Sequence, residues 1–115
     1  MSAIGPGLLV LLGIHRDDTG AEADQLAAKV RQLRIFADAD GRINEPLGDH
    51  EVLCVSQFTL YGDVRRGNRP SYVAAAAPEI AEPLYERFCE LHGAQRGRFE
   101  TYMRVALDND EPVTL

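Results

Sequence analysis

Five consecutive aliphatic residues, Leu8 to Leu12, lie between Gly7 and Gly13. A run of this length with glycines at both ends predicts a strand that is buried on both faces. Thr19 and Glu22 follow at the spacing of a capping box, in which each side chain accepts a hydrogen bond from the backbone of the other residue. Apolar residues then recur at the spacing that places them on one face of a helix, and they are Ala23, Leu26, Ala27, Val30 and Leu33. The sequence therefore predicts a strand followed by a capped helix.

The rest of the chain predicts one more helix and several strands. Residues 51–60 predict a central strand, apolar in its first half and alternating in its second. Helix-spaced apolar residues appear next as Ile80, Leu84, Phe88 and Leu91. An interior proline clashes with the preceding turn, so we expect a short turn at Pro78, a helix starting near Pro83 and an end at His92 and Gly93. Residues 101–107 alternate as a strand does, and residues 113–115 predict the start of another.

The bulk composition limits the class of protein. A length of 115 residues suits one domain, residues 1–115, of mixed α/β or α+β type. No apolar stretch approaches the ~20 residues that span a bilayer, and the start lacks the pattern of a secretory signal, so a cytoplasmic location is expected. Cys54 and Cys89 are expected to be reduced and buried, because no spacing indicates a metal site.

The net charge of −6 argues against a protein that wraps long nucleic acid. It remains compatible with a protein that binds only the end of an RNA. The arginines are clustered, which suits either a local contact with an anion or ordinary solvated loops. The two clusters are Arg65, Arg66 and Arg69, and Arg96, Arg98 and Arg104.

Most catalytic motifs are missing. The histidines His15, His50 and His92 have no metal-binding spacing, and neither a P-loop nor a G-x-S-x-G motif occurs. Ser56 and Thr59 are candidate nucleophiles with His15 or His50 as the base, but nothing in the spacing supports the pairing. The alternative interpretation is that both hydroxyls satisfy backbone groups of a strand.

Five segments together resemble one enzyme family. Residues 56–62, Ser-Gln-Phe-Thr-Leu-Tyr-Gly, resemble the signature strand of the D-aminoacyl-tRNA deacylases (D-tyrosyl-tRNA(Tyr) deacylases). The other similar segments follow in the order of the family, and they are residues 5–13, residues 33–36 with 40–41 and 44, residues 69–72 with 83–88, and residues 97–99 with 103, 109–110 and 112–114. The resemblance extends over nearly the whole chain. It implies the deacylase fold, a mixed α/β fold with a mostly antiparallel, barrel-like sheet and two helices.

The resemblance also implies an activity. Members of the family hydrolyse the ester between a D-amino acid and the 3′-terminal adenosine of tRNA, many also clear mischarged glycine, and they proofread chirality in translation as cytoplasmic homodimers without a metal or cofactor. Their pocket is attributed mainly to backbone atoms and to the substrate's own 2′-hydroxyl. On this chain the implied catalytic residues are Ser56, Gln57 and Thr59, with Thr59 as a positioning residue. The implied substrate-binding residues are Phe58, which suits stacking on adenine, with Phe99 and Met103.

The sequence departs from the family at several places, among them the loop at residues 46–48 and the stretch at residues 91–97, which are shorter than in the family. A first strand-forming segment of the family has no counterpart, and the Gly-Pro motif that enters the partner subunit's pocket to exclude L-amino acids reads Glu111-Pro112. A glutamate brings a side chain and a negative charge where the family has neither. An alternative is therefore a non-catalytic or impaired homologue that binds the tRNA 3′ end or another partner. Outside the family, the remaining alternative is a small α/β interaction domain.

Overall fold

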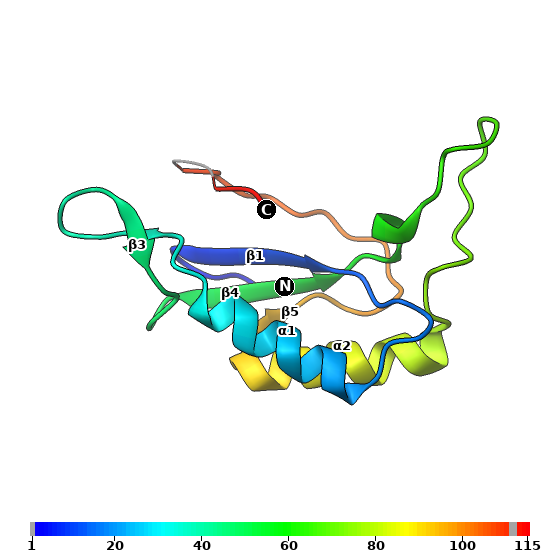
Figure 1. The fold of residues 1–115 in the computed structure, drawn as a ribbon, viewed down its shortest axis with the longest axis horizontal. Coiled ribbons are helices and arrows are strands. Elements are labelled where there is room, and N and C mark those ends of the chain that lie inside the picture. Colours follow the sequence, from blue (N-terminus) through cyan, green and yellow to red (C-terminus); the bar gives the residue numbers. More distant parts are fainter. Residues whose placement is uncertain (1, 111–112) are drawn as a thin grey trace.

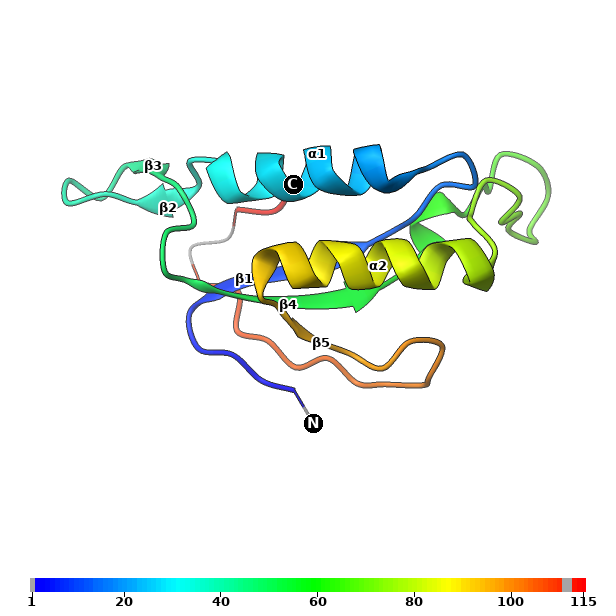
Figure 2. The same ribbon diagram turned by 90° about the horizontal axis from the view of Figure 1, so that it is seen from below.

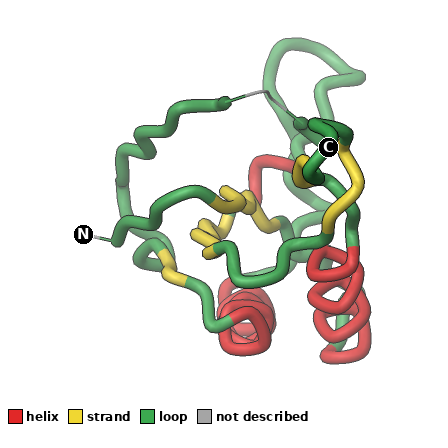
Figure 3. The backbone as a smooth tube through the Cα atoms, turned by 90° about the vertical axis from the view of Figure 1, so that its left-hand side faces the viewer, coloured by secondary structure: helices red, strands yellow, loops and turns green. Residues whose placement is uncertain are grey.

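The computed structural model describes residues 2–110 and 113–115, and two helices lie together on one side of its strands (Figures 1 and 3). In chain order the elements are β1 (Gly7–Leu12), α1 (Gly20–Gln32), β2 (Phe36–Ala37), β3 (Ile43–Glu45), β4 (Glu51–Ser56), a 3-10 helix (Phe58–Tyr61), α2 (Pro78–His92) and β5 (Gln95–Arg96). Within the described residues, no helix combines the length and the apolar character that crossing a bilayer requires. The prediction of a mixed α/β fold with two helices is confirmed.

The main sheet differs from the antiparallel, barrel-like sheet that we expected. Its strand order is β1-β4-β5, and both pairings are parallel, with Leu12 opposite Ser56 and Cys54 opposite Arg96. Parallel neighbours need a long crossover, and the chain supplies one through α1 and another through α2. The sheet is open among the described residues, and antiparallel pairing there is limited to the small β2–β3 pair and two isolated bridges, His15 with Ala75 and Asp63 with Ser71.

Helix α1 begins where the capping box predicts. Thr19 Oγ1 accepts a hydrogen bond from the Ala21 N–H at 3.3 Å, and Glu22 Oε2 accepts one from the Thr19 N–H at 2.8 Å. The helix buries Ala23 and Ala27, whereas Leu26 is 43% exposed. Small residues on the inner face let α1 approach the neighbouring helix closely.

Helix α2 runs straight through Pro83, so the prediction of a turn at Pro78 and a start near Pro83 was wrong. Pro78 occupies the first helical turn, where a missing N–H costs nothing. Pro83 removes one hydrogen bond, but the buried face of Ala81, Tyr85, Phe88 and Cys89 holds the helix against the sheet and α1. The predicted end is confirmed, because Gly93 caps the helix with a φ of 57°, a conformation that glycine adopts at little cost.

The core joins the helices to the sheet, because its buried cluster combines residues of α1 and α2 with Leu12 and Cys54 of the strands; Figure 2 shows the two helices from below. The most completely buried members of the core are Cys54, Tyr85, Phe88 and Cys89, and Leu47 is similarly buried outside this cluster. Both cysteines are free and buried, as predicted. Hydrogen bonding with Cys89 and burial raise the pKa of the Cys54 thiol, so this thiol stays protonated at neutral pH.

Three strand predictions are wrong. Strand β1 is not buried on both faces, since Leu11 is 46% exposed on the side away from the helices. Residues 101–107 form no strand, and Tyr102 is 92% exposed. Alternation makes a strand only where a partner edge accepts its backbone hydrogen bonds, and this segment pairs with none of the described strands. Residues 113–115 are also not a strand.

Candidate functional site

The candidate site lies where two parallel strands end side by side. Strand β4 stops at Ser56 instead of continuing to Leu60, and the 3-10 helix Phe58–Tyr61 follows. The Gln57 N–H still donates to the Leu12 carbonyl at 2.8 Å, which extends the pairing of β1 and β4 by one residue. Carboxyl ends of adjacent parallel strands are the usual position for ligand sites in open α/β sheets.

The polar groups at this strand end face one another. The Gln57 side-chain amide donates a hydrogen bond to Thr59 Oγ1. The backbone N–H groups of Phe58 and Thr59 open the 3-10 helix, and they have no hydrogen-bond acceptor in the part of the chain that the structure describes. Ser56 is half-buried and Thr59 is exposed. The strand end at residues 56–59 therefore offers backbone donors and the hydroxyls of Ser56 and Thr59, and no charged side chain of its own.

The histidines lie with aromatic partners. His15 packs edge-on against Tyr61 with ring centroids 5.4 Å apart, and His50 stacks on Phe36 at 4.2 Å. Across residues 2–110 and 113–115, no histidine forms a hydrogen bond with Ser56 or Thr59. The geometry thus provides neither hydroxyl with the general base that a nucleophile requires.

Phe58 points outward beside a residue that the sequence did not single out. Phe58 is 56% exposed, and its ring meets the Tyr72 ring edge-on at 5.1 Å. Tyr72 is itself 40% exposed and packs against Gly62. The pair presents an aromatic surface directly next to the strand end. No sequence spacing signals this contact, because the intervening loop decides which residue returns to Phe58.

Phe99 and Met103 line a hollow that is separate from the strand end and lies on the face of the sheet away from the helices. Figure 3 shows the chain arching over the strands there, and the volume is about 1910 Å³. Leu60 lines the same hollow, so the hollow adjoins the 3-10 helix. Ser56, Gln57, Phe58 and Thr59 are not among its lining residues.

Met103 packs against Gly97, and the Phe99 ring lies 5.9 Å from that of Tyr85. Phe99 and Met103 are therefore brought to one cavity, while Phe58 faces the solvent on the side of Tyr72. The motif Glu111-Pro112 lies outside the described residues. Among the residues that are described, no three histidine, cysteine or acidic side chains gather as metal ligands would.

The family profile and the sequence relatives that match this chain are described as tRNA deacylases. The sequence profile of the family described as D-Tyr-tRNA(Tyr) deacylase matches residues 1–115. A D-aminoacyl-tRNA deacylase of Symbiobacterium thermophilum is 55% identical over 97% of this chain and 79% of its own length. The D-aminoacyl-tRNA deacylase of Roseiflexus sp. (strain RS-1) is 56% identical over 100% of this chain and 79% of its own.

Solved structures with the same fold are also found. The "c-Myc DNA Unwinding Element Binding Protein" superposes with a TM-score of 0.89 at 40% identity, covering 98% of this chain and 82% of that one. A "probable eukaryotic D-amino acid tRNA deacylase" has the same fold, with a TM-score of 0.60 at 24% identity over 76% of this chain and 53% of its own. Because the family profile extends over the whole chain and relatives above 50% identity cover it almost completely, the chain belongs to the D-Tyr-tRNA(Tyr) deacylase family.

Proposed function

We propose that this protein hydrolyses the ester bond of D-aminoacyl-tRNA and releases the free D-amino acid and the tRNA. One observation carries the proposal: relatives named D-aminoacyl-tRNA deacylase are 55–56% identical over nearly the whole chain. The same activity on mischarged glycyl-tRNA belongs to the proposal, as do a role in chiral proofreading, a cytoplasmic location and a single domain over residues 1–115. No metal or cofactor is invoked.

The chemistry suits a site that is built from backbone donors. An aminoacyl ester is already activated, so its hydrolysis needs a positioned water and a stabilised oxyanion more than a strong nucleophile. The unpaired N–H groups of Phe58 and Thr59 are the donors that we assign to the oxyanion. The substrate's own 2′-hydroxyl is the group that we expect to direct the attacking water.

Thr59 is a positioning residue in this proposal. Its Oγ1 already accepts a hydrogen bond from the Gln57 amide, which lowers rather than raises its nucleophilicity, and an amide takes up no proton at neutral pH. The Thr59 O–H remains free to donate to the substrate. Gln57 therefore orients Thr59, while Ser56 fixes the end of β4 from which both residues project.

The 3′-terminal adenosine is assigned to the exposed face of Phe58. Base stacking on an aromatic ring tolerates any sequence and is worth about 1–3 kcal/mol per base. Phe99 and Met103 are assigned to the far wall of the substrate pocket, on the hollow that Leu60 connects to the strand end. Glu111 and Pro112 are assigned to chiral selection across a homodimer.

A second copy of this chain has an apolar surface to cover. Leu9, Leu11 and Leu53 line the hollow on the sheet face away from α1 and α2, and Leu11 is 46% exposed there. Burial of such a face is a strong driving force for association, and homodimerisation follows from the same resemblance that gives the activity. Sedimentation of the purified protein at micromolar concentration tests it, and a monomer throughout would contradict it.

One assay tests the activity. D-Tyr-tRNA and L-Tyr-tRNA are incubated separately with the protein, and release of tyrosine is followed. We expect release from the D-form only, and no release at micromolar enzyme would contradict the proposal. Glu111→Gly is tested in parallel, because faster or more selective hydrolysis by this variant would show that the glutamate weakens the selectivity motif.

A further inference from the structure

Residues 63–71, which we call the arm, form a long loop that projects from the body of the protein beyond the 3-10 helix (Figures 1 and 2). Two backbone hydrogen bonds between Asp63 and Ser71, of 2.8 and 2.9 Å, close its base. Gly67 has a φ of 60°, a left-handed conformation that allows the chain to reverse near the tip. The arm is therefore held in place at its base while both of its sides face the solvent.

The arm is basic on a chain that is acidic overall. It contains three arginines and one acid, whereas the whole chain has a net charge of −6. Arg65 is paired with Asp63 through Nη2 and Oδ2 at 2.7 Å, and hydrogen bonds from Arg65 hold the pKa of Asp63 at about 2. Arg66 and Arg69 are exposed and form no ion pair with any of the described residues. Two guanidinium groups thus remain available to an anionic partner.

The base of the arm is continuous with the candidate site. The arm starts directly after the 3-10 helix and returns to the body at Tyr72, whose ring contacts Phe58 at 5.1 Å. A nucleic acid whose terminal base stacks on Phe58 would continue past this aromatic pair toward the arm. A strand that leaves Phe58 in this direction would bring its next backbone phosphates to the arm that carries Arg66 and Arg69.

We propose that Arg66 and Arg69 bind backbone phosphates of the tRNA next to its 3′ end, so that the arm selects aminoacyl-tRNA over a free aminoacyl ester. The inference rests on the proposed function, and it adds a surface to the strand-end site. Phosphate contacts supply much of the affinity of proteins for nucleic acids. An acidic protein needs such contacts concentrated where the substrate lies, since the rest of its surface repels the tRNA.

The test compares two substrates that carry the same ester. One is D-Tyr-tRNA, and the other is 3′-O-D-tyrosyl-adenosine, which has no phosphate. The variant is Arg66→Ala with Arg69→Ala, and the matched control is Lys29→Ala with Arg42→Ala, which removes two exposed cations from α1 and from the turn between β2 and β3. The charge-preserving pair Arg66→Lys with Arg69→Lys completes the set.

We expect the ratio of kcat/KM for D-Tyr-tRNA to that for the adenosine ester to fall on the order of tenfold or more in the arginine-to-alanine variant at low salt. The dependence of log kcat/KM for the tRNA on log salt should become shallower by about 0.7 to 0.9 per lost contact. The control variant should keep the wild-type ratio. The arginine-to-lysine variant should keep most of it, because a lysine ammonium also binds a phosphate, although as a point charge.

Other outcomes separate the two proposals. An unchanged ratio and salt slope, or an equal loss on both substrates, would contradict the role of the arm. A change in sedimentation in the arginine-to-alanine variant would assign the arm to contacts with a second copy instead. If the wild-type protein hydrolysed neither substrate, the proposed function would fail. The role of the arm would then be tested by the affinity of the protein for tRNA that carries no amino acid. The arginine-to-alanine variant must lower this affinity, and the control variant must not.

Discussion

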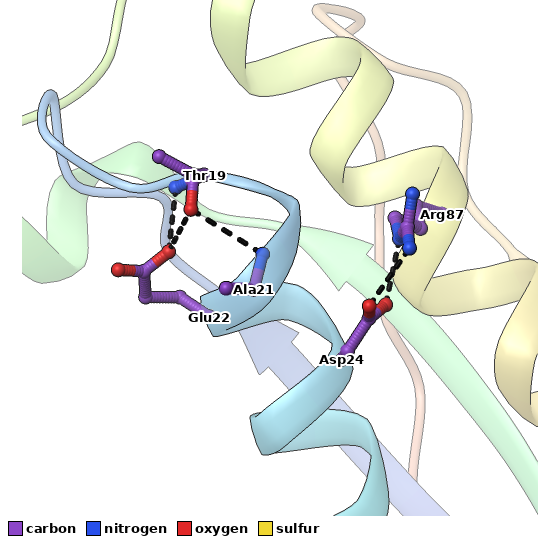
Figure 4. A network of polar contacts seen from close by, with 5 residues as sticks. All are labelled: Thr19, Ala21, Glu22, Asp24 and Arg87. Atoms are coloured by element: carbon purple, nitrogen blue, oxygen red, sulfur yellow. Dashed lines mark hydrogen bonds and ion pairs between the residues drawn. The ribbon is translucent and has the colours of Figure 1, made fainter.

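Arg87 of α2 donates two hydrogen bonds to the carboxylate of Asp24 on α1, from Nε to Oδ1 at 2.6 Å and from Nη2 to Oδ2 at 2.7 Å (Figure 4). The paired, fork-like geometry is the one in which a guanidinium binds a carboxylate best. This ion pair joins the two helices that cover the sheet. The hydrogen bonds from Arg87 lower the pKa of the Asp24 carboxyl, although both side chains are about half exposed.

The first prediction concerns this ion pair and pH. A lowered pKa in the folded state stabilises the protein above the ordinary aspartate pKa of 3.8, and this contribution is lost as the pH falls through the folded-state value. Asp24→Asn should lower Tm slightly at pH 7, and the difference should shrink at pH 3 and below. Thermal unfolding followed by circular dichroism checks it, with the exposed Asp17→Asn as the control. A difference that is independent of pH would show that packing, and not charge, is responsible.

The second prediction concerns the start of α1. Thr19 Oγ1 accepts a hydrogen bond from the Ala21 N–H, and the Glu22 carboxylate accepts one from the Thr19 backbone N–H (Figure 4). Thr19→Ala should lower the free energy of unfolding by about 1 kcal/mol, because it leaves an N-terminal N–H of the helix without its acceptor. Thr19→Ser should retain most of the stability. Urea denaturation measures both, and equal losses in the two variants would rule out the capping hydroxyl as the cause.

The third prediction concerns Tyr85, which is 1% exposed. Its hydroxyl oxygen lies 2.9 Å from the Cys54 carbonyl oxygen and 3.2 Å from that of Gly97, and its one proton is shared between these two acceptors, which ties β4 to the segment that follows β5. Tyr85→Phe should cost about 1–2 kcal/mol of unfolding free energy, since buried carbonyls lose a donor.

Burial also raises the pKa of Tyr85 above its ordinary value of 10.0. The folded state then keeps the proton that the unfolded state releases, so this contribution is fully present below pH 10 and is lost as the pH rises further. The stability difference between wild type and Tyr85→Phe should therefore narrow above pH 10. Urea denaturation at pH 8 and pH 10.5 measures it, and a constant difference would contradict the burial argument.

The fourth prediction concerns Thr59 and the chemical step. If Thr59 positions the substrate, Thr59→Ala should change the turnover of D-Tyr-tRNA by less than about tenfold. A loss of about three orders of magnitude or more would identify Thr59 as a nucleophile instead. Single-turnover hydrolysis with saturating enzyme separates this chemical effect from weaker binding. Gln57→Ala, which removes only the orienting amide, should give a smaller change of the same kind.

Local patterns predicted those parts of the fold in which neighbours along the chain decide the structure. The capping box at Thr19, the glycine end at Gly93 and the strand at residues 7–12 all depend on residues a few positions apart. The signature at residues 56–62 identified the family in the same way, because it is a contiguous string.

Only the tertiary structure decided how these pieces combine. It stops β4 at Ser56, because the chain turns into a 3-10 helix there. It also carries α2 through Pro83, because burial of Tyr85 and Phe88 outweighs one lost hydrogen bond.

The same dependence on distant residues holds for the site. Strand β4 pairs in parallel with β1, although about forty residues separate them, and Tyr72 reaches Phe58 only because the arm closes at its base. The sequence by itself determined the local elements and the family, since both are encoded in short stretches of chain. Only the folded chain decided the strand direction, the extent of α2 and the aromatic pair beside the strand end. Each of these depends on the energy of contacts between residues far apart in the sequence, which a local pattern does not encode.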